Sequence, residues 1–169
     1  SVKEGYSGMT GGSLENGQIT KRLEAGQPLG SFWLYEVEGV WQTQDEINSN
    51  AHLSSARPGH LRYKDQNGDG VIDDRDKKFM GSYIPKYNYG INVSLEYKNF
   101  DLTISGYGAG GNKIYNGIKN TRLGGENITV DIFNDRWTGA GSTNSHPGAE
   151  RDQVASSYYL EKGNYFKLS

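Results

Sequence analysis

Residues 65–76 carry oxygen-bearing groups at the spacing of a calcium-binding loop. Calcium takes about 6–8 oxygen ligands, and a loop of about 12 residues supplies them from alternate positions, with glycine at the sixth. Here Gly70 is at the sixth position, and oxygen donors occupy positions one, three, five, seven, nine and twelve. These candidate ligands are Asp65, Asn67, Asp69, the backbone carbonyl of Val71, Asp73 and Asp76. The last position is usually a glutamate that binds through both oxygens, so the shorter Asp76 predicts a weaker site.

The alternative for this segment is a solvated acidic turn, because Asn67-Gly68 and Asp69-Gly70 are common turn dipeptides. The D-x-N-x-D-G signature satisfies several ligand positions at once, which favours calcium. The preceding residues contain a Pro58-Gly59 turn and then alternate like a strand, whereas a sensor loop would lie between two helices. We therefore expect calcium to be a structural cofactor that stiffens a connection in a β protein.

No other group of residues has the spacing of a catalytic or metal site. The chain has no cysteine, which excludes disulfides, zinc–thiolate sites and cysteine nucleophiles. His52, His60 and His146 are far apart and lack zinc-site spacing. No feature selects a pair of carboxylates for glycoside hydrolysis. The net charge of −2, with dispersed basic residues, predicts no nucleic-acid partner. We expect no enzymatic activity and assign no catalytic residue.

The composition predicts an all-β chain with one or two short helices. Hydrophobic residues make up 34% of the 169 residues, and the 24 glycines and 12 tyrosines favour many short strands. Strands are expected over residues 18–26 and 30–41, and Thr43 followed by Glu46 predicts a short helix over residues 45–50.

A second helix and a long loop are expected in the last third of the chain. Val130, Phe133 and Trp137 recur at helical spacing, so residues 129–137 are expected to form a helix packed on the sheet. Residues 138–157 are polar, contain a His146-Pro147-Gly148 turn, and are expected to form a long exposed loop.

The clearest periodicity lies in residues 87–97, where every odd residue is apolar and every even residue is polar or glycine. The alternation restarts with Phe100, Leu102 and Ile104 after a tight turn, so we expect an antiparallel hairpin with one apolar face. A soluble sandwich would bury that face, whereas an outer-membrane barrel would turn it toward lipid. The glycine-rich residues 106–111 formally match a dinucleotide fingerprint, but their flanks do not fit, and a bend or loop is expected there.

The order of motifs resembles the C-terminal barrel region of SusC/RagA-like TonB-dependent outer-membrane transporters. The matching segments are EAGQPLGSF (24–32), GVWQTQDEI (39–47), PGHLRYKDQNGDGVI (58–72), GSYIPKYNYG (81–90), YKNFDL (97–102), GNKIYN (111–116), RWT (136–138) and YLEKGNYFKL (159–168). They cover most of the chain, and their number and order make the resemblance specific.

The resemblance implies antiparallel strands and hairpins from a transmembrane β-barrel, with residues 1–169 forming one incomplete piece of it. It also implies a parent protein in the bacterial outer membrane that imports oligosaccharides or peptides, with a SusD-like surface lipoprotein and TonB as partners. The plug domain, the TonB-interacting segment and most barrel strands of such transporters have no counterpart in this sequence. We therefore expect a segment of a longer transporter.

A different class of protein also fits the residues. A self-contained, secreted, calcium-stabilised β domain that binds carbohydrate or acts as an adhesin would suit the tyrosine richness and the polar loops. The two hypotheses differ in what they expect for Ile91, Val93 and Leu95: a self-contained domain would seal them in a core.

Overall fold

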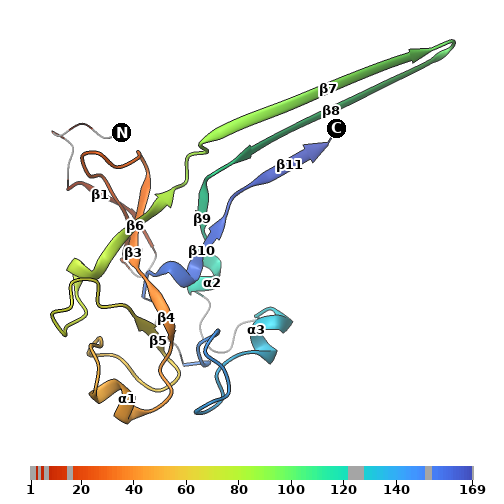
Figure 1. The fold of residues 1–169 in the computed structure, drawn as a ribbon. Helices are drawn as coiled ribbons and strands as arrows, with labels where there is room; N and C mark the ends of the chain where they lie inside the picture. Colours follow the sequence, from red (N-terminus) through yellow and green to blue (C-terminus); the bar gives the residue numbers. More distant parts are fainter. Residues whose placement is uncertain are drawn as a thin grey trace.

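The computed structural model describes residues 3, 5, 8–14, 17–121, 128–150 and 154–168. These residues form mainly antiparallel strands with a few short helices and no closed barrel, which confirms the predicted all-β class (Figure 1). The strands are β1 (Thr10–Ser13), β2 (Ile19–Arg22), β3 (Ser31–Tyr35), β4 (Val37–Val40), β5 (Leu61–Tyr63), β6 (Lys77–Ser82), β7 (Tyr87–Tyr97), β8 (Phe100–Gly110), β9 (Lys113–Tyr115), β10 (Leu160–Lys162) and β11 (Tyr165–Leu168). The helices are α1 (Gln44–Asn48), α2 (Gly117–Thr121) and α3 (Val130–Asn134), with 3-10 turns η2 (Asp74–Asp76) and η3 (Ser157–Tyr159).

None of the helices in the described part of the chain is long and apolar enough to cross a membrane.

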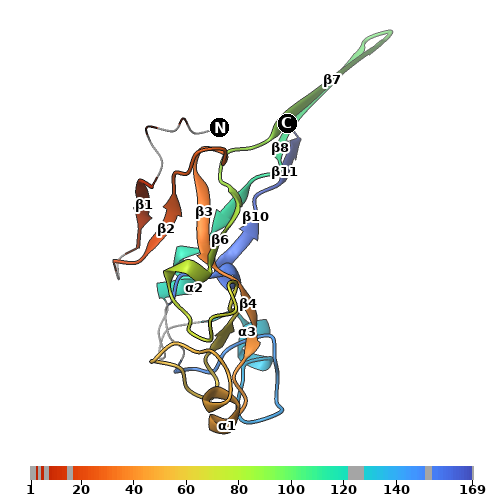
Figure 2. The ribbon, with the colours of Figure 1, turned by 60° about the vertical axis from the view of Figure 1, so that its left-hand side comes forward.

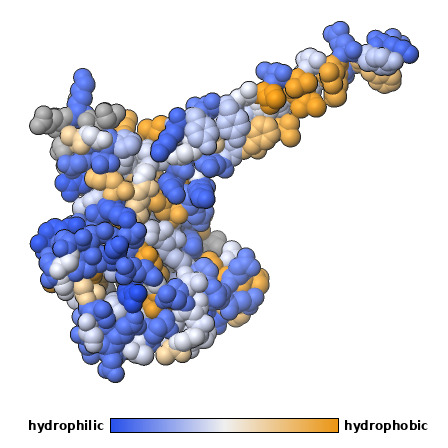
Figure 3. All heavy atoms as spheres, viewed as in Figure 1, coloured by the Kyte–Doolittle hydropathy of each residue, from blue (hydrophilic) through white to orange (hydrophobic). Residues whose placement is uncertain are grey.

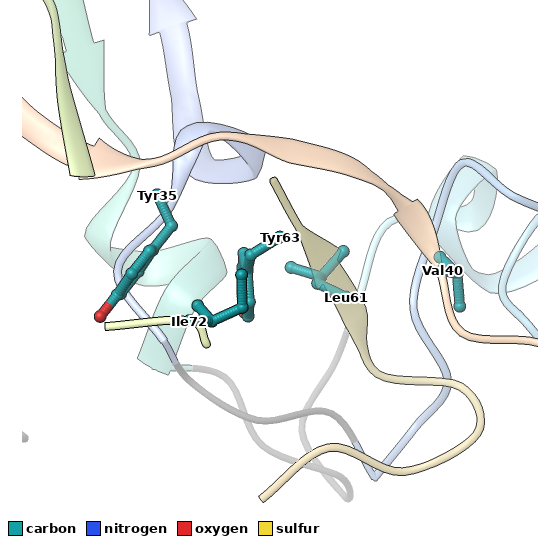
Figure 4. Packing of buried hydrophobic residues seen from close by; sticks show 5 residues of the cluster. All are labelled: Tyr35, Val40, Leu61, Tyr63 and Ile72. Carbon is teal, nitrogen blue, oxygen red and sulfur yellow. The ribbon is translucent and has the colours of Figure 1, made fainter. Parts of the chain in front are cut away.

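The body of the molecule holds its hydrophobic core between small sheets. One sheet has the order β1-β2-β3-β6, and further pairs are β4-β5 and β9-β10. Strand β4 lies beyond the end of β3, on the side of α1 (Figure 2). One core cluster contains Tyr35, Val40, Leu61, Tyr63 and Ile72 (Figure 4), and a second contains Phe32, Leu34 and Ala155. Strand β3 supplies residues to both clusters, so it joins the two halves of the body.

Strands β7 and β8 form the predicted hairpin, and each is 11 residues long. The register is unbroken from Tyr87 opposite Gly110 to Tyr97 opposite Phe100. Lys98 in the turn has a φ of 54°, the left-handed conformation that a two-residue hairpin turn uses. The hairpin projects away from the body, and β11 pairs with β8 to make a three-stranded sheet (Figure 1).

The glycine-rich stretch is strand rather than the predicted bend, because β8 continues through Gly110. The glycines at alternate positions on one face make room for aromatic rings. A Cβ atom on Gly110 would lie 2.5 Å from the Tyr87 hydroxyl, and one on Gly108 would lie 2.5 Å from the Tyr89 ring. Aromatic rings therefore cover the row of glycines formed by Gly106, Gly108 and Gly110, called the glycine row below. The row belongs to an antiparallel strand pair and forms no phosphate-binding turn.

Helix α1 forms where predicted, and Thr43 caps it by accepting a hydrogen bond from the Glu46 backbone N–H at 3.2 Å. The predicted packing of residues 129–137 on the sheet is wrong for two of the three apolar residues that indicated a helix there. Val130 and Phe133 are exposed, and only Trp137, beyond the helix, packs against the first core cluster. The helix ends at Asn134, so Trp137 leaves the helical face and turns toward Gly59.

Residues 138–150 are irregular and mostly exposed, and the Gln42 side chain is one of several groups that tie them to the body. The Gln42 amide donates to the Thr143 carbonyl at 3.0 Å and accepts from the Gly141 N–H at 2.9 Å and the Trp137 indole N–H at 3.2 Å. Residues 151–153 of the predicted 138–157 loop lie outside the described residues.

Candidate metal-binding loop and exposed apolar face

The acidic loop connects β5 to β6, and its buried residue Ile72 ties it to the body. Ile72 is 5% exposed and packs with Tyr35 and Tyr63 in the first core cluster (Figure 4). The loop ends in the turn η2, whose N-cap is Asp73. A change in the conformation of the loop that moves Ile72 is therefore coupled to the packing of β3 and β5.

The first and last candidate ligands hold the loop closed through the backbone. The Asp65 carboxylate accepts hydrogen bonds from the N–H groups of Gly68 at 2.6 Å and Gly70 at 2.8 Å. These donors, that of Gly70 foremost, hold the pKa of Asp65 below its ordinary value. Asp76 is fully buried, and its two oxygens accept from the N–H groups of Gln66 at 2.9 Å and Asp73 at 2.8 Å.

Arg75 provides the positive charge within the loop. Its guanidinium lies 2.7 Å from the Asp69 carboxylate and 2.8 Å from the Asp73 carboxylate, which are the candidate ligands at positions five and nine. The hydrogen bond from Arg75 is the main cause that lowers the pKa of Asp73. The Asn67 amide donates to Asp69 at 3.1 Å, so the middle of the loop is joined by side chains as well.

The donor set suits calcium chemically, because the candidate ligands offer hard oxygen atoms. Within the described ranges, however, no group of three or more histidine, aspartate or glutamate side chains is arranged to hold a metal ion. The oxygens of Asp65 and Asp76 face backbone N–H groups, and those of Asp69 and Asp73 face Arg75. To bind one ion together, Asp69 and Asp73 would have to turn away from Arg75.

Sequence reasoning missed Arg75, although a basic residue inside an acidic loop is visible in the sequence. The spacing rule counts oxygen donors and ignores cations. Whether the guanidinium reaches Asp69 depends on the loop conformation.

The hairpin carries a continuous apolar face that no described part of the chain covers. Ile91, Val93 and Leu95 are 54%, 38% and 58% exposed, so they are not sealed in a core. Leu102 and Ile104 lie opposite Leu95 and Val93 on the same face and are exposed as well. Apolar residues follow one another along the projecting hairpin in Figure 3. The other face carries small polar groups, such as the Ser94 and Thr103 hydroxyls 3.5 Å apart.

Aromatic residues bracket the aliphatic ones on this face. Near the body, Tyr89 and Phe166 stack with ring centroids 6.0 Å apart, and at the tip Tyr97 lies opposite Phe100. Residues 89–97 span about 27 Å of strand. At a tilt of about 40° this is about 20 Å of height, close to the ~25 Å apolar band of outer-membrane barrels, which aromatic girdles flank on both sides.

Comparison with known proteins finds similarity to two curated receptors of Formosa agariphila. The chain is 32% identical to "TonB-dependent receptor P26" over 158 residues. The aligned segment covers 90% of this chain and 16% of that protein. The chain is also 32% identical over 152 residues to "TonB-dependent receptor P3", which covers 88% of this chain and 15% of that protein. No family model matches the chain. Nearly all of this chain is thus similar to a segment about one-sixth the length of TonB-dependent receptors.

Proposed function

We propose that the chain is a wall segment of an outer-membrane TonB-dependent receptor that imports nutrients, of the SusC/RagA type. The main support is the uncovered apolar face of β7, β8 and β11, bracketed by aromatic residues. Exposing this much contiguous apolar surface to water is unfavourable, whereas lipid is a favourable solvent for it. The similarity to two TonB-dependent receptors supports the same proposal.

In this proposal the opposite face of the sheet lines the interior of the barrel. Asn88, Asn92 and Ser94 lie on it, as expected for a wall that contacts water. The hairpin tip at Lys98 is then one end of the wall, and the body containing the acidic loop lies outside the membrane at the other end.

The partners of the whole receptor follow from its class. We propose TonB as the source of energy, a SusD-like surface lipoprotein as the partner, and an oligosaccharide or peptide as cargo. The resemblance of the ordered motifs to SusC/RagA-like transporters supports these assignments. The parent protein would lie in the bacterial outer membrane.

We also propose that residues 65–76 bind calcium as a structural ion, with ligands Asp65, Asn67, Asp69, Val71, Asp73 and Asp76. The donor chemistry and spacing support this assignment, and Ile72 would transmit the stiffening to the core. Calcium should raise the midpoint of thermal unfolding, because a ligand that binds only the folded state stabilises it by mass action. The variant Asp69→Ala should lose this shift, and an unchanged midpoint of the unmodified chain at millimolar calcium would remove the proposal.

A pair of substitutions tests the wall assignment in a receptor that contains this chain. Val93→Asp places a charge on the apolar face, whereas Ser94→Asp places the same charge on the polar face one residue away. A basic residue at the bilayer midplane costs about 2–4 kcal/mol and an acidic one less, so Val93→Asp should reduce folded receptor in the outer membrane and Ser94→Asp should not. Equal levels of both folded variants would contradict a lipid-facing wall.

The rival hypothesis, a self-contained secreted carbohydrate-binding or adhesive domain, predicts the opposite environment for the hairpin. Val93 is 38% exposed in a chain whose body buries Leu34 and Val40 almost completely. A water-soluble domain would have to expose that apolar face to water, which is unfavourable, so the observation favours the receptor wall.

A further inference from the structure

Strands β9 and β10 place two lysines directly opposite each other. Lys113 is across from Lys162 in the antiparallel register, so both side chains leave the same face of this short ladder. Like charges in directly opposed positions destabilise a strand pair. In the described parts of the chain neither lysine forms an ion pair with a carboxylate. The adjacent Glu161 is paired with Ile114 and accepts a hydrogen bond from Asn116 instead.

The stem of a third lysine lies beside the turn that leads into β9, over a glycine that leaves room for it. A Cβ atom on Gly111 would lie 2.8 Å from the Cβ of Lys86, so the stem of Lys86 lies over Gly111, two residues before Lys113. The Lys86 backbone N–H donates to the Gly110 carbonyl at 2.9 Å, which fixes where this stem begins. Lys86 also has no carboxylate partner among the described residues.

The three lysines, called the lysine cluster below, lie where the projecting hairpin meets the body. Strand β8 ends at Gly110 just before β9, and β10 ends just before β11 (Figure 1). A hollow of about 350 Å³ adjoins Lys86 and is lined in part by Leu29, Phe79 and Ile84. Uncompensated positive charge therefore adjoins both an apolar hollow and the aromatic end of the exposed face.

We propose that Lys86, Lys113 and Lys162 bind a phosphate group. A phosphate brings more than one negative charge and several acceptor oxygens, so it would offset the repulsion between the opposed lysines and accept hydrogen bonds from their ammonium groups. The phosphate is either the headgroup of a membrane lipid or a free anion. The lipid source rests on the proposed barrel wall, whereas the phosphate site itself rests only on the lysine cluster.

Titration calorimetry on a receptor that contains this chain, in uncharged detergent micelles, tests the site. One arm adds dihexanoyl phosphatidic acid, and the other adds inorganic phosphate. The double variant Lys113→Gln/Lys162→Gln should bind about tenfold more weakly or worse, and Lys86→Gln should weaken binding to a smaller degree. Sodium chloride should weaken binding by the unmodified chain, because exposed charges are screened. The matched control Lys3→Gln/Lys98→Gln removes the same charge elsewhere and should bind within about twofold of the unmodified chain.

The arms separate the two sources. Lysine-dependent binding of the lipid alone assigns a lipid headgroup, and equal lysine-dependent binding in both arms assigns a free anion and leaves the barrel-wall proposal untouched. Thermal unfolding guards against misfolded variants: without phosphate, Lys113→Gln should unfold at the same or a higher temperature than the unmodified chain, because it relieves repulsion. Phosphate should raise the midpoint of thermal unfolding only when all three lysines of the cluster are present. No binding in either arm, or equal loss in the control variant, would overturn the proposal.

Discussion

The body and the hairpin place apolar side chains that share one face of a strand in opposite surroundings. In β3, Phe32 and Leu34 are 2% and 0% exposed, because Ala155, Tyr115 of β9 and Leu160 of β10 pack with them. In β7, Ile91, Val93 and Leu95 are between 38% and 58% exposed, and no described segment packs over them. Both strands have paired neighbours, so backbone hydrogen bonding does not distinguish them. The comparison shows that alternation sets which residues share a face, whereas the covering layer decides whether that face is a core.

The strongest way to break this comparison is to remove the same side chain from both regions. Leu34→Ala should lower the free energy of unfolding by about 2–5 kcal/mol, because it leaves a cavity in a packed core. Leu95→Ala should change it by less than ~1 kcal/mol, because Leu95 is 58% exposed and no described segment packs over the face that it shares with Leu102. Urea unfolding in detergent measures both, and equal losses would mean that the hairpin face is packed after all.

A smaller loss of stability is expected within the hairpin, when a residue of its glycine row is enlarged. Gly108→Ala would place a Cβ atom 2.5 Å from both the Tyr89 ring and the Tyr165 carbonyl oxygen. This overpacking should cost about 1–3 kcal/mol and loosen β11 from β8. The matched control is Gly90→Ala, whose Cβ would meet only the Gly106 carbonyl oxygen at 3.6 Å, an ordinary contact. Amide hydrogen exchange of β11 checks both variants, and equal protection in the two would refute the role of the rings.

The smallest effect concerns the exposed acidic loop. The pKa of Asp65 is lowered in the folded chain, so its contribution to stability is present above its ordinary pKa and is lost as the pH falls through the lower folded value. Thermal midpoints measured from pH 5 downward should therefore fall less steeply in Asp65→Asn than in the unmodified chain. Parallel curves for the two proteins would show that the Gly68 and Gly70 hydrogen bonds do not favour the ionised carboxylate.

The sequence predicts the elements of this fold better than it predicts their surroundings. The hairpin follows from strict alternation, and α1 follows from Thr43, because both signals are local. The predicted burial of Val130 and Phe133 is wrong, because helical spacing identifies residues that share a face but does not show that anything packs on that face. The bend predicted at Gly106 was also wrong, because the rings that fill the space above the glycines come from β7 and β11.

The candidate sites divide in the same way. The ligand spacing of residues 65–76 is a sequence property, and calcium binding there remains a prediction. The contact of Arg75 with Asp69 and the opposition of Lys113 and Lys162 depend on loop conformation and on strand register. The register of β9 and β10 joins residues more than 40 positions apart, so no local pattern reveals it.

Spin labels along β7 test the central claim, that lipid takes the place of a core on the apolar face of the hairpin. The chain contributes no cysteine. Single cysteines at positions 91 to 95 are labelled in a receptor that contains the chain, with any cysteine elsewhere replaced by serine, and the receptor is reconstituted in a bilayer. We predict that collisions with oxygen, which concentrates in lipid, are highest at positions 91, 93 and 95. Collisions with a water-soluble nickel complex should be highest at 92 and 94. Low oxygen accessibility at 91, 93 and 95, or no alternation with a period of two, would contradict the account.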